Sequence, residues 1–145
     1  ENFDKKREYG KMVHLVLSRI HTKNDLDSVL DEFKFRGMIN DPERSDLNQY
    51  LNKLLERPEL KPYFEKDSTI YAEKEIMLPD GKSYRPDRVV FKDSETIILD
   101  YKTGQQQKKH ISQIKQYASI LKDMGYQNVK TVLVYVGEEN EVVEV

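Results

Sequence analysis

The segment Thr96-Ile97-Ile98-Leu99-Asp100-Tyr101-Lys102 joins a short apolar run to a pair of charged residues. An apolar run of this length is typical of a strand that is buried on both faces of a sheet. Side chains alternate along a strand, so Asp100 and Lys102 share one face while Tyr101 lies on the other. Charges at the end of a buried strand are costly unless they are paired, solvated or bound to an ion. The segment therefore predicts a central strand that carries a polar site.

The residues just before this strand predict a partner for it. Residues 84–91 have the composition of a strand, and Pro86 marks an edge or a bulge near its start. A short loop through 92–95 would join the two strands as a hairpin and bring Asp87 close to Asp100. Two carboxylates repel each other, and a divalent cation is the usual remedy. Together with the neighbouring lysine, which would orient or activate water and stabilise developing charge, they predict metal-assisted hydrolysis.

The rest of the chain predicts a mixed sheet with helices around it. Apolar residues recur at helical spacing in four segments, namely 9–20, 24–36, 41–57 and 112–124. Residues 70–78 and 129–136 have strand patterns, and 141–145 predicts one more short strand. This order of helices and strands indicates an α/β protein, and we expect residues 1–145 to form a single domain.

Composition narrows the classes of protein to which the chain can belong. Its 145 residues include 24 Lys and Arg against 26 Asp and Glu, a net charge of −2, so local residues must carry any nucleic-acid binding. The chain has no cysteine. That excludes disulfides, Cys-ligated zinc and iron–sulfur clusters, and it favours an intracellular, cytoplasmic setting. No apolar run approaches the roughly 20 residues of a membrane span.

Four short motifs follow one another along the chain: Gly10-x-x-x-His14, Arg85-Pro86-Asp87, Asp100-Tyr101-Lys102-Thr103-Gly104 and Gln113-x-x-x-Tyr117. In this order they resemble the PD-(D/E)XK nuclease superfamily, and in particular its RecB/AddA-type branch. Each motif alone is a weak signal, but the four together cover residues 9–136 and are specific. The resemblance implies a restriction-endonuclease-like fold, with a mixed central β-sheet flanked by helices and an N-terminal helical segment.

The resemblance also implies which residues form the site. The metal ligands carried over from the family are His14, Asp87, Asp100 and the backbone carbonyl of Tyr101, and the metal is Mg²⁺ or Mn²⁺. Lys102 is the catalytic lysine. Gln113 and Tyr117 share one helix face and would reach into the site or touch the DNA strand. Glu75, which shares a strand face with Glu73, is expected to be the family's additional acidic residue.

The implied function is that of a Mg²⁺- or Mn²⁺-dependent deoxyribonuclease, and specifically an exonuclease in DNA end processing, recombination or repair. The expected partners are DNA, as single strands or unwound ends, and a UvrD/Rep-type helicase domain in the same polypeptide. The chain begins at Glu1 rather than Met, and we expect it to be the C-terminal part of such a helicase-nuclease. No contact with a membrane is expected.

Several of these residues also have ordinary structural explanations. Taken alone, His14 is more often a core or helix-face histidine than a ligand. Asp87 can pair with a neighbouring arginine, and Asp100 with Lys102. Gln113 and Tyr117 are compatible with an ordinary amphipathic helix.

Basic residues outside the motifs are ambiguous in the same way. Lys108 and Lys109 would contact phosphates, or they belong to a solvated loop. His21 and His110 match no motif, and we expect both at the surface. The alternative functions are a catalytically silent nuclease fold that binds DNA or a partner, and a hydrolase of small phosphoesters.

Overall fold

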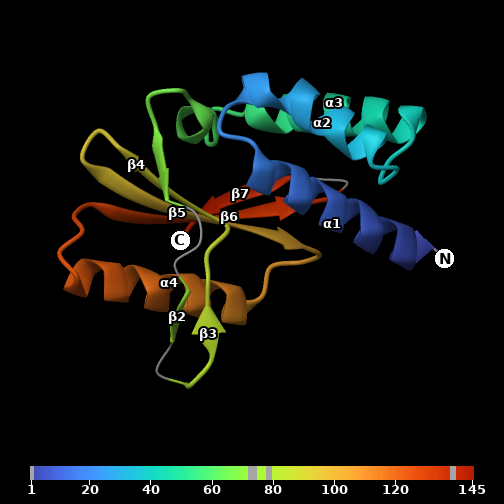
Figure 1. The fold of residues 1–145 in the computed structure, drawn as a ribbon. Coiled ribbons are helices and arrows are strands. Elements are labelled where there is room, and N and C mark those ends of the chain that lie inside the picture. The colour runs from blue at the N-terminus through green and yellow to red at the C-terminus, as the bar shows by residue number, and fades with distance from the viewer. Residues whose placement is uncertain (1, 72–74, 78–79, 138–139) are drawn as a thin grey trace. The chain divides into compact units, whose positions relative to one another are not determined.

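The computed structural model describes residues 2–71, 75–77, 80–137 and 140–145. The chain divides into two compact units, residues 1–66 and residues 67–145, which are described separately below (Figure 1). None of the described helices is both long enough and apolar enough to cross a membrane.

The N-terminal unit is helical, as predicted. Its elements are α1 (Asn2–Arg19), α2 (Leu26–Phe35) and α3 (Asp41–Leu55), with single 3₁₀ turns at η1 (Lys23–Asp25) and η2 (Lys61–Phe64). Helix α2 contacts both α1 and α3. The apolar residues that set the helical period are buried, among them Val13, Leu17, Leu30, Leu47 and Leu51.

A capping box fixes the start of α3. The side chain of Asn40 accepts a hydrogen bond from the backbone N–H of Glu43 at 2.9 Å, and Glu43 accepts one from the backbone N–H of Asn40 at 2.9 Å. Two of the N–H groups that a helix start leaves unsatisfied are thereby paired. Pro42, which has no N–H to pair, lies in the first turn.

The C-terminal unit contains a mixed five-stranded sheet in the order β1-β4-β5-β6-β7. Its strands are β1 (Thr69–Tyr71), β4 (Arg88–Lys92), β5 (Glu95–Thr103), β6 (Val129–Val136) and β7 (Glu141–Glu144). Strands β5 and β6 are parallel and the other pairs antiparallel. Helix α4 (Lys108–Asp123) connects the two parallel strands, so the predicted mixed sheet is confirmed.

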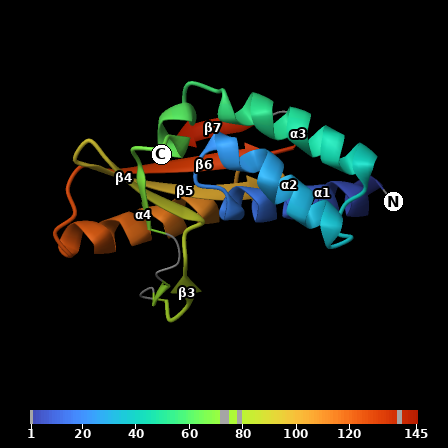
Figure 2. The ribbon, with the colours of Figure 1, turned by 45° about the horizontal axis from the view of Figure 1, so that its top comes forward.

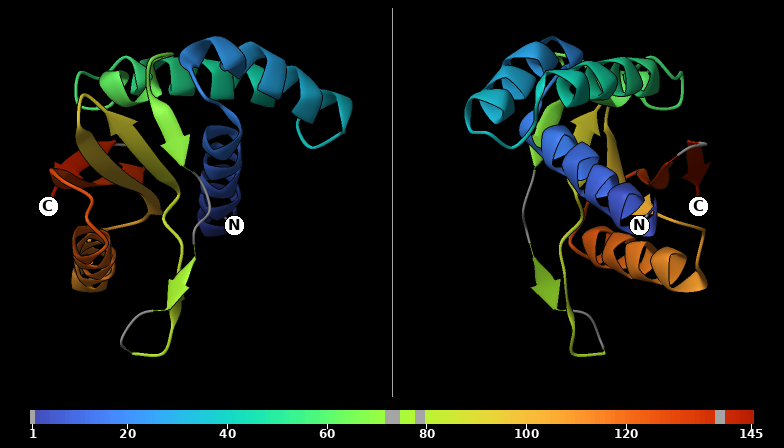
Figure 3. Two further views of the ribbon diagram at one scale, coloured as in Figure 1. Left: turned by 60° about the vertical axis from the view of Figure 1, so that its left-hand side comes forward. Right: turned by 90° about the vertical axis from the view of Figure 1, so that its right-hand side faces the viewer.

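Two predicted strands are each divided between two sheets. Residues 84–91 do not form one strand: Tyr84 belongs to β3 (Ser83–Tyr84), which pairs with β2 (Ile76–Met77), and β4 begins only at Arg88. Pro86 cannot donate to a ladder, which explains the break. Of the predicted strand 70–78, residues 70 and 71 belong to β1 and residues 76 and 77 to β2, while residues 72–74 and 78 lie outside those that the structure describes. The separate β2–β3 sheet extends away from the larger one (Figure 3).

The turn between β4 and β5 is the short one that the sequence predicts. Lys92 pairs with Glu95, which leaves Asp93 and Ser94 as the two turn residues. Their φ angles are 51° and 63°, the left-handed values of a type I′ turn. This turn matches the natural twist of antiparallel strands and fixes their register.

Helix α4 covers one face of the five-stranded sheet (Figure 2). Its buried side chains pack against residues of three strands in one apolar cluster, which includes Val89, Ile98, Ile114, Tyr117, Ala118, Leu121 and Leu133. Since side chains alternate along β5, Asp100 and Lys102 lie on the same face as Ile98. The charged pair is therefore on the side of the sheet that α4 covers.

Candidate active site

Asp87 and Asp100 lie together where β4 begins. Arg88 pairs with Leu99, so Asp87 lies opposite Asp100 just outside the ladder. The backbone N–H of Asp87 donates to Oδ1 of Asp100 at 2.9 Å, and the N–H of Tyr101 donates to Oδ2 of Asp87 at 2.8 Å. Each carboxylate is thus held by backbone beside the other, and the predicted proximity of the two is confirmed.

Asp100 is a buried carboxyl group in an unfavourable place for a charge. Its side chain is 3% exposed. Burial and the nearby Asp87 carboxylate raise its pKa to about 6, although hydrogen bonds from Tyr84 and the Asp87 backbone and the charge of Lys102 act in the opposite direction. A cation placed between the two carboxylates would relieve this repulsion.

Lys102 supplies a positive charge on the same face. Its Nζ lies 3.6 Å from Oδ2 of Asp100, and its side chain is 25% exposed, so the ammonium remains accessible to a ligand. The ion pair is also what the purely structural interpretation of these residues predicts. Lys102 therefore combines a fixed position with access, which suits a group that acts on a bound phosphate.

Tyr84 links Asp100 to helix α4. Its hydroxyl donates a hydrogen bond to Oδ2 of Asp100, and its ring lies edge-on to that of Tyr117, with ring centroids 5.5 Å apart and planes at 66°. Both tyrosines are buried. Sequence reasoning missed Tyr84, because Pro86 interrupts the strand and the alternation of faces cannot be followed from Asp87 back to residue 84.

Removing the Tyr84 hydroxyl should destabilise the fold. We expect Tyr84→Phe to lower the free energy of unfolding by about 1–3 kcal/mol at pH 7, since a buried carboxylate loses a donor. Urea denaturation measures the change. Tyr126→Phe is the control, because Tyr126 stacks on Phe91 through its ring. Equal stability of the Tyr84 variant and the wild type would contradict the hydrogen bond.

Helix α4 begins four residues earlier than predicted, and this changes the position of three residues. Lys108 and Lys109 are exposed in its first turn instead of in a loop. His110 is buried, 8% exposed, with Nδ1 3.0 Å from the hydroxyl of Tyr135, so the prediction of a surface histidine is wrong. On the same helix Gln113 is half-buried.

Glu75 and His14 are the remaining predicted residues. Glu75 is exposed and lies next to β2 rather than within a strand. Glu73 lies outside the described residues. His14 lies on α1, half-buried, in the N-terminal unit. The positions of the two units relative to each other are not determined, so His14 as a ligand stays a prediction.

The two carboxylates fit a divalent cation in their chemistry. Carboxylate oxygens are the ligands that Mg²⁺ and Mn²⁺ prefer, and a cation would offset both causes of the raised pKa of Asp100, which are burial first and then repulsion from Asp87. Within the described part of the C-terminal unit, no third His, Asp or Glu side chain joins the pair. Further ligands would have to come from backbone, water or another part of the chain.

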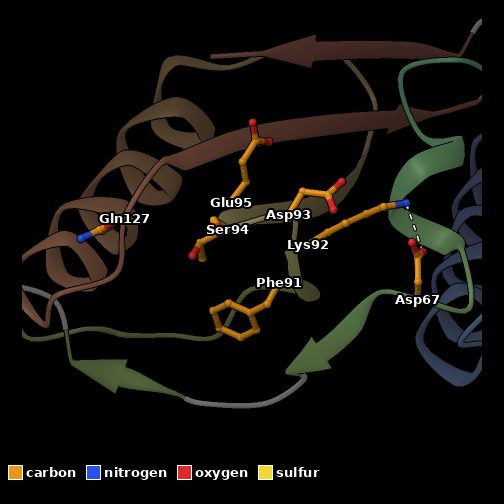
Figure 4. Close-up of a pocket in the computed structure, with 8 residues that line it drawn as sticks. Asp67, Phe91, Lys92, Asp93, Ser94, Glu95 and Gln127 are labelled. Carbon is orange, nitrogen blue, oxygen red and sulfur yellow. Dashed lines mark ion pairs between the residues drawn. The ribbon is translucent and has the colours of Figure 1, made fainter.

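An open pocket of about 330 Å³ lies at the opposite end of the β4–β5 hairpin (Figure 4). Its lining includes the turn residues and Lys92, whose Nζ lies 3.2 Å from a carboxylate oxygen of Asp67. It contains none of the residues that the sequence predicts for the site. The acidic pair and Lys102 are therefore the candidate active site.

Comparison with known proteins identifies a family and several similar solved structures. The sequence model described as the PD-(D/E)XK nuclease superfamily matches residues 1–144. No curated protein matches the chain. A crystal structure of a protein named SSO0001 is 18% identical, with a TM-score of 0.35 over 92% of this chain. The chain spans 65% of the length of that protein.

Proposed function

Because the chain belongs to the PD-(D/E)XK nuclease superfamily and has its restriction-endonuclease-like α/β fold, we propose that it is a metal-dependent deoxyribonuclease. One observation carries the proposal: Asp87, Asp100 and Lys102 lie together at one end of the β4–β5 hairpin. Two carboxylates and an ammonium at one place are the groups that phosphodiester hydrolysis needs.

The proposed roles combine the side-chain positions within the C-terminal unit with the ligand set that the family resemblance implies. Asp87 and Asp100 would hold Mg²⁺ or Mn²⁺, with the Tyr101 carbonyl and His14 as further ligands. When bound, the cation supplies Lewis-acid polarisation of the phosphate and neutralises the carboxylates. Lys102 orients the attacking water and stabilises the negative charge that develops on the phosphate.

The order of the motifs supports a narrower proposal. We place the chain in the RecB/AddA-type branch, as the intracellular nuclease domain of a helicase-nuclease that digests DNA from ends in repair or recombination. Gln113 would reach the site or the DNA strand from α4, while Tyr117 acts through its contact with Tyr84. The exposed Lys108 and Lys109 would contact backbone phosphates.

Digestion of end-labelled DNA tests the proposal. Single- and double-stranded DNA are incubated with the full chain in Mg²⁺, Mn²⁺ or EDTA, and we expect metal-dependent cleavage with a product ladder that reveals its polarity. The matched variants are Asp87→Asn and Asp93→Asn, each of which removes one carboxylate from the hairpin. Asp93 is exposed, and its φ of 51° suits asparagine. Cleavage should be lost only in the Asp87 variant.

Substitution of His14 tests the ligand that the structure leaves open. We expect His14→Ala to raise the Mn²⁺ concentration for half-maximal cleavage roughly tenfold or more, as the loss of a metal contact does. His21→Ala is the control, since His21 is exposed in the same unit. An unchanged Mn²⁺ dependence would exclude His14 from the metal site.

The alternative is a catalytically silent nuclease fold that binds DNA or a partner. Two observations favour this alternative. Asp100 forms an ion pair with Lys102, and among the described residues of the C-terminal unit no third acidic or histidine side chain joins the two carboxylates. A folded chain that binds DNA but cleaves none in any metal would support this alternative and contradict the enzyme.

A further inference from the structure

A buried polar pair lies on the covered face of the sheet, beside the candidate active site. Nδ1 of His110 is 3.0 Å from the hydroxyl of Tyr135, and the two rings lie with centroids 5.9 Å apart. The hydroxyl also receives a hydrogen bond from the backbone N–H of Gln107, the residue that precedes α4. Tyr135 can accept from Gln107 while donating to His110, which requires an imidazole with its proton on Nε2.

The register of the sheet places this pair next to Lys102. In the parallel β5–β6 ladder, Lys102 pairs with Tyr135, and both side chains lie on the face that α4 covers. Burial is the largest cause of the lowered pKa of His110, and the charge of Lys102 is the next. The ladder and the hydrogen bond to Tyr135 thus place the imidazole and the ammonium on the same face of the sheet, and both burial and the lysine charge favour the neutral imidazole.

A purely structural role does not account for a polar pair at this position. Along the same face of α4 the residues one, two and three turns later are Ile114, Tyr117 and Leu121, all buried in the apolar cluster. An apolar residue at position 110 would continue that face at no desolvation cost, whereas a buried imidazole and hydroxyl must satisfy each other. The pair costs stability that an apolar contact would not, and its neighbour is Lys102.

We propose that His110 is a positioning residue for Lys102. Its hydrogen bond to Tyr135 links the first turn of α4 to β6, at the position that pairs with Lys102, and its neutral ring does not repel the ammonium. Lys102 is thereby kept directed to the carboxylate pair, with its Nζ 3.6 Å from Asp100. The inference rests on the proposed nuclease function, in which Lys102 acts on the phosphate.

The test uses two variants of the full chain, His110→Gln and Tyr135→Phe, with Ser112→Ala as the control at an exposed position of the same helix. The first readout needs no activity: trace acylation of lysine amines, measured by peptide mass spectrometry. We expect the reactivity of Lys102 to rise several-fold in both variants while that of the exposed Lys122 is unchanged. The Ser112 variant should match the wild type at both lysines.

Kinetics give the second readout. With an oligonucleotide substrate, kcat should fall roughly tenfold in both variants with KM little changed, because the positioning of a group that acts in the transition state is lost. Wild-type reactivity of Lys102 in both variants would overturn the inference. Absence of cleavage by the wild type would instead refute the nuclease function, and the acylation result would still decide whether His110 positions Lys102. Tyr135→Phe removes a single oxygen, so it provides a folded variant if His110→Gln does not fold.

Discussion

Lys102→Ala is expected to lower the rate of DNA cleavage by about 10²- to 10⁴-fold, the range for loss of a catalytic acid–base or charge-stabilising group. The ammonium is the positive charge of the site, 3.6 Å from Oδ2 of Asp100. Without it, the charge that develops on the phosphate loses its partner. Single-turnover cleavage with protein in excess over labelled DNA measures the chemical step directly.

Two further observations make the Lys102 test specific. Lys122→Ala is the matched control, because Lys122 is exposed near the end of α4 and away from the carboxylates. Its rate should equal that of the wild type. Lys102→Ala should also raise the pKa of Asp100 further, since the lysine charge now lowers it. If the Lys102 variant cleaved DNA as fast as the wild type, the role of the lysine would be limited to its structural ion pair with Asp100.

Asp100→Asn is expected to abolish cleavage and, in the absence of metal, to stabilise the fold at pH 7. In the proposed function, asparagine would remove a ligand oxygen and the charge that would hold the cation. The stability gain follows from the pKa of Asp100, which is raised from 3.8 to about 6 in the folded chain. At pH 7 the folded protein carries a buried charge that asparagine does not have.

The pH dependence of this gain has a definite sign. Because the pKa of Asp100 is higher in the folded state, the folded chain binds more protons than the unfolded chain between about pH 4 and pH 6. The titration of Asp100 therefore increases the free energy of unfolding of the wild type as the pH falls from about 6 to about 4. The advantage of Asp100→Asn should be largest at pH 7 and should disappear near pH 4.

Urea denaturation at a series of pH values measures both trends. Taking the difference between variant and wild type cancels the other titrating groups, including His110, whose lowered pKa acts in the opposite direction. Asp93→Asn, in the exposed turn, should show no such difference. A constant difference between pH 7 and pH 4 would mean that Asp100 is not the group that titrates.

The pairing of Asp87 with Asp100 could be predicted from the sequence because the two residues belong to strands that are adjacent in the chain and joined by a short turn. The apolar run 97–99 predicted β5, and the short turn brought Asp87 to Asp100, both as the structure has them. These features follow from strand alternation and hairpin closure, which act over a few residues.

The other residues at or near the site, Tyr84, His110 and His14, depend on contacts between segments that no local sequence pattern encodes. Tyr84 lies before the break at Pro86, and its contact with Asp100 arises only because β3 leaves the main sheet. His110 was assigned to the surface because it belongs to none of the motifs, whereas the structure buries it in the first turn of α4. Its partner Tyr135 is 25 residues further along the chain. His14 lies in the other unit, so its role depends on an arrangement of units that is not determined.

The two-residue turn at Asp93 and Ser94 determines which residue of β5 lies opposite Asp87. Side chains alternate with a period of two, so a one-residue shift in the pairing of β5, caused by a codon inserted or deleted between Lys92 and Glu95, would turn its charged residues to the opposite face. Asp87 would then face an apolar side chain. In the evolution of this gene, a change in the length of this turn is therefore compatible with a working acidic pair only where the loop absorbs it and the register of β5 is kept, although both turn residues are exposed.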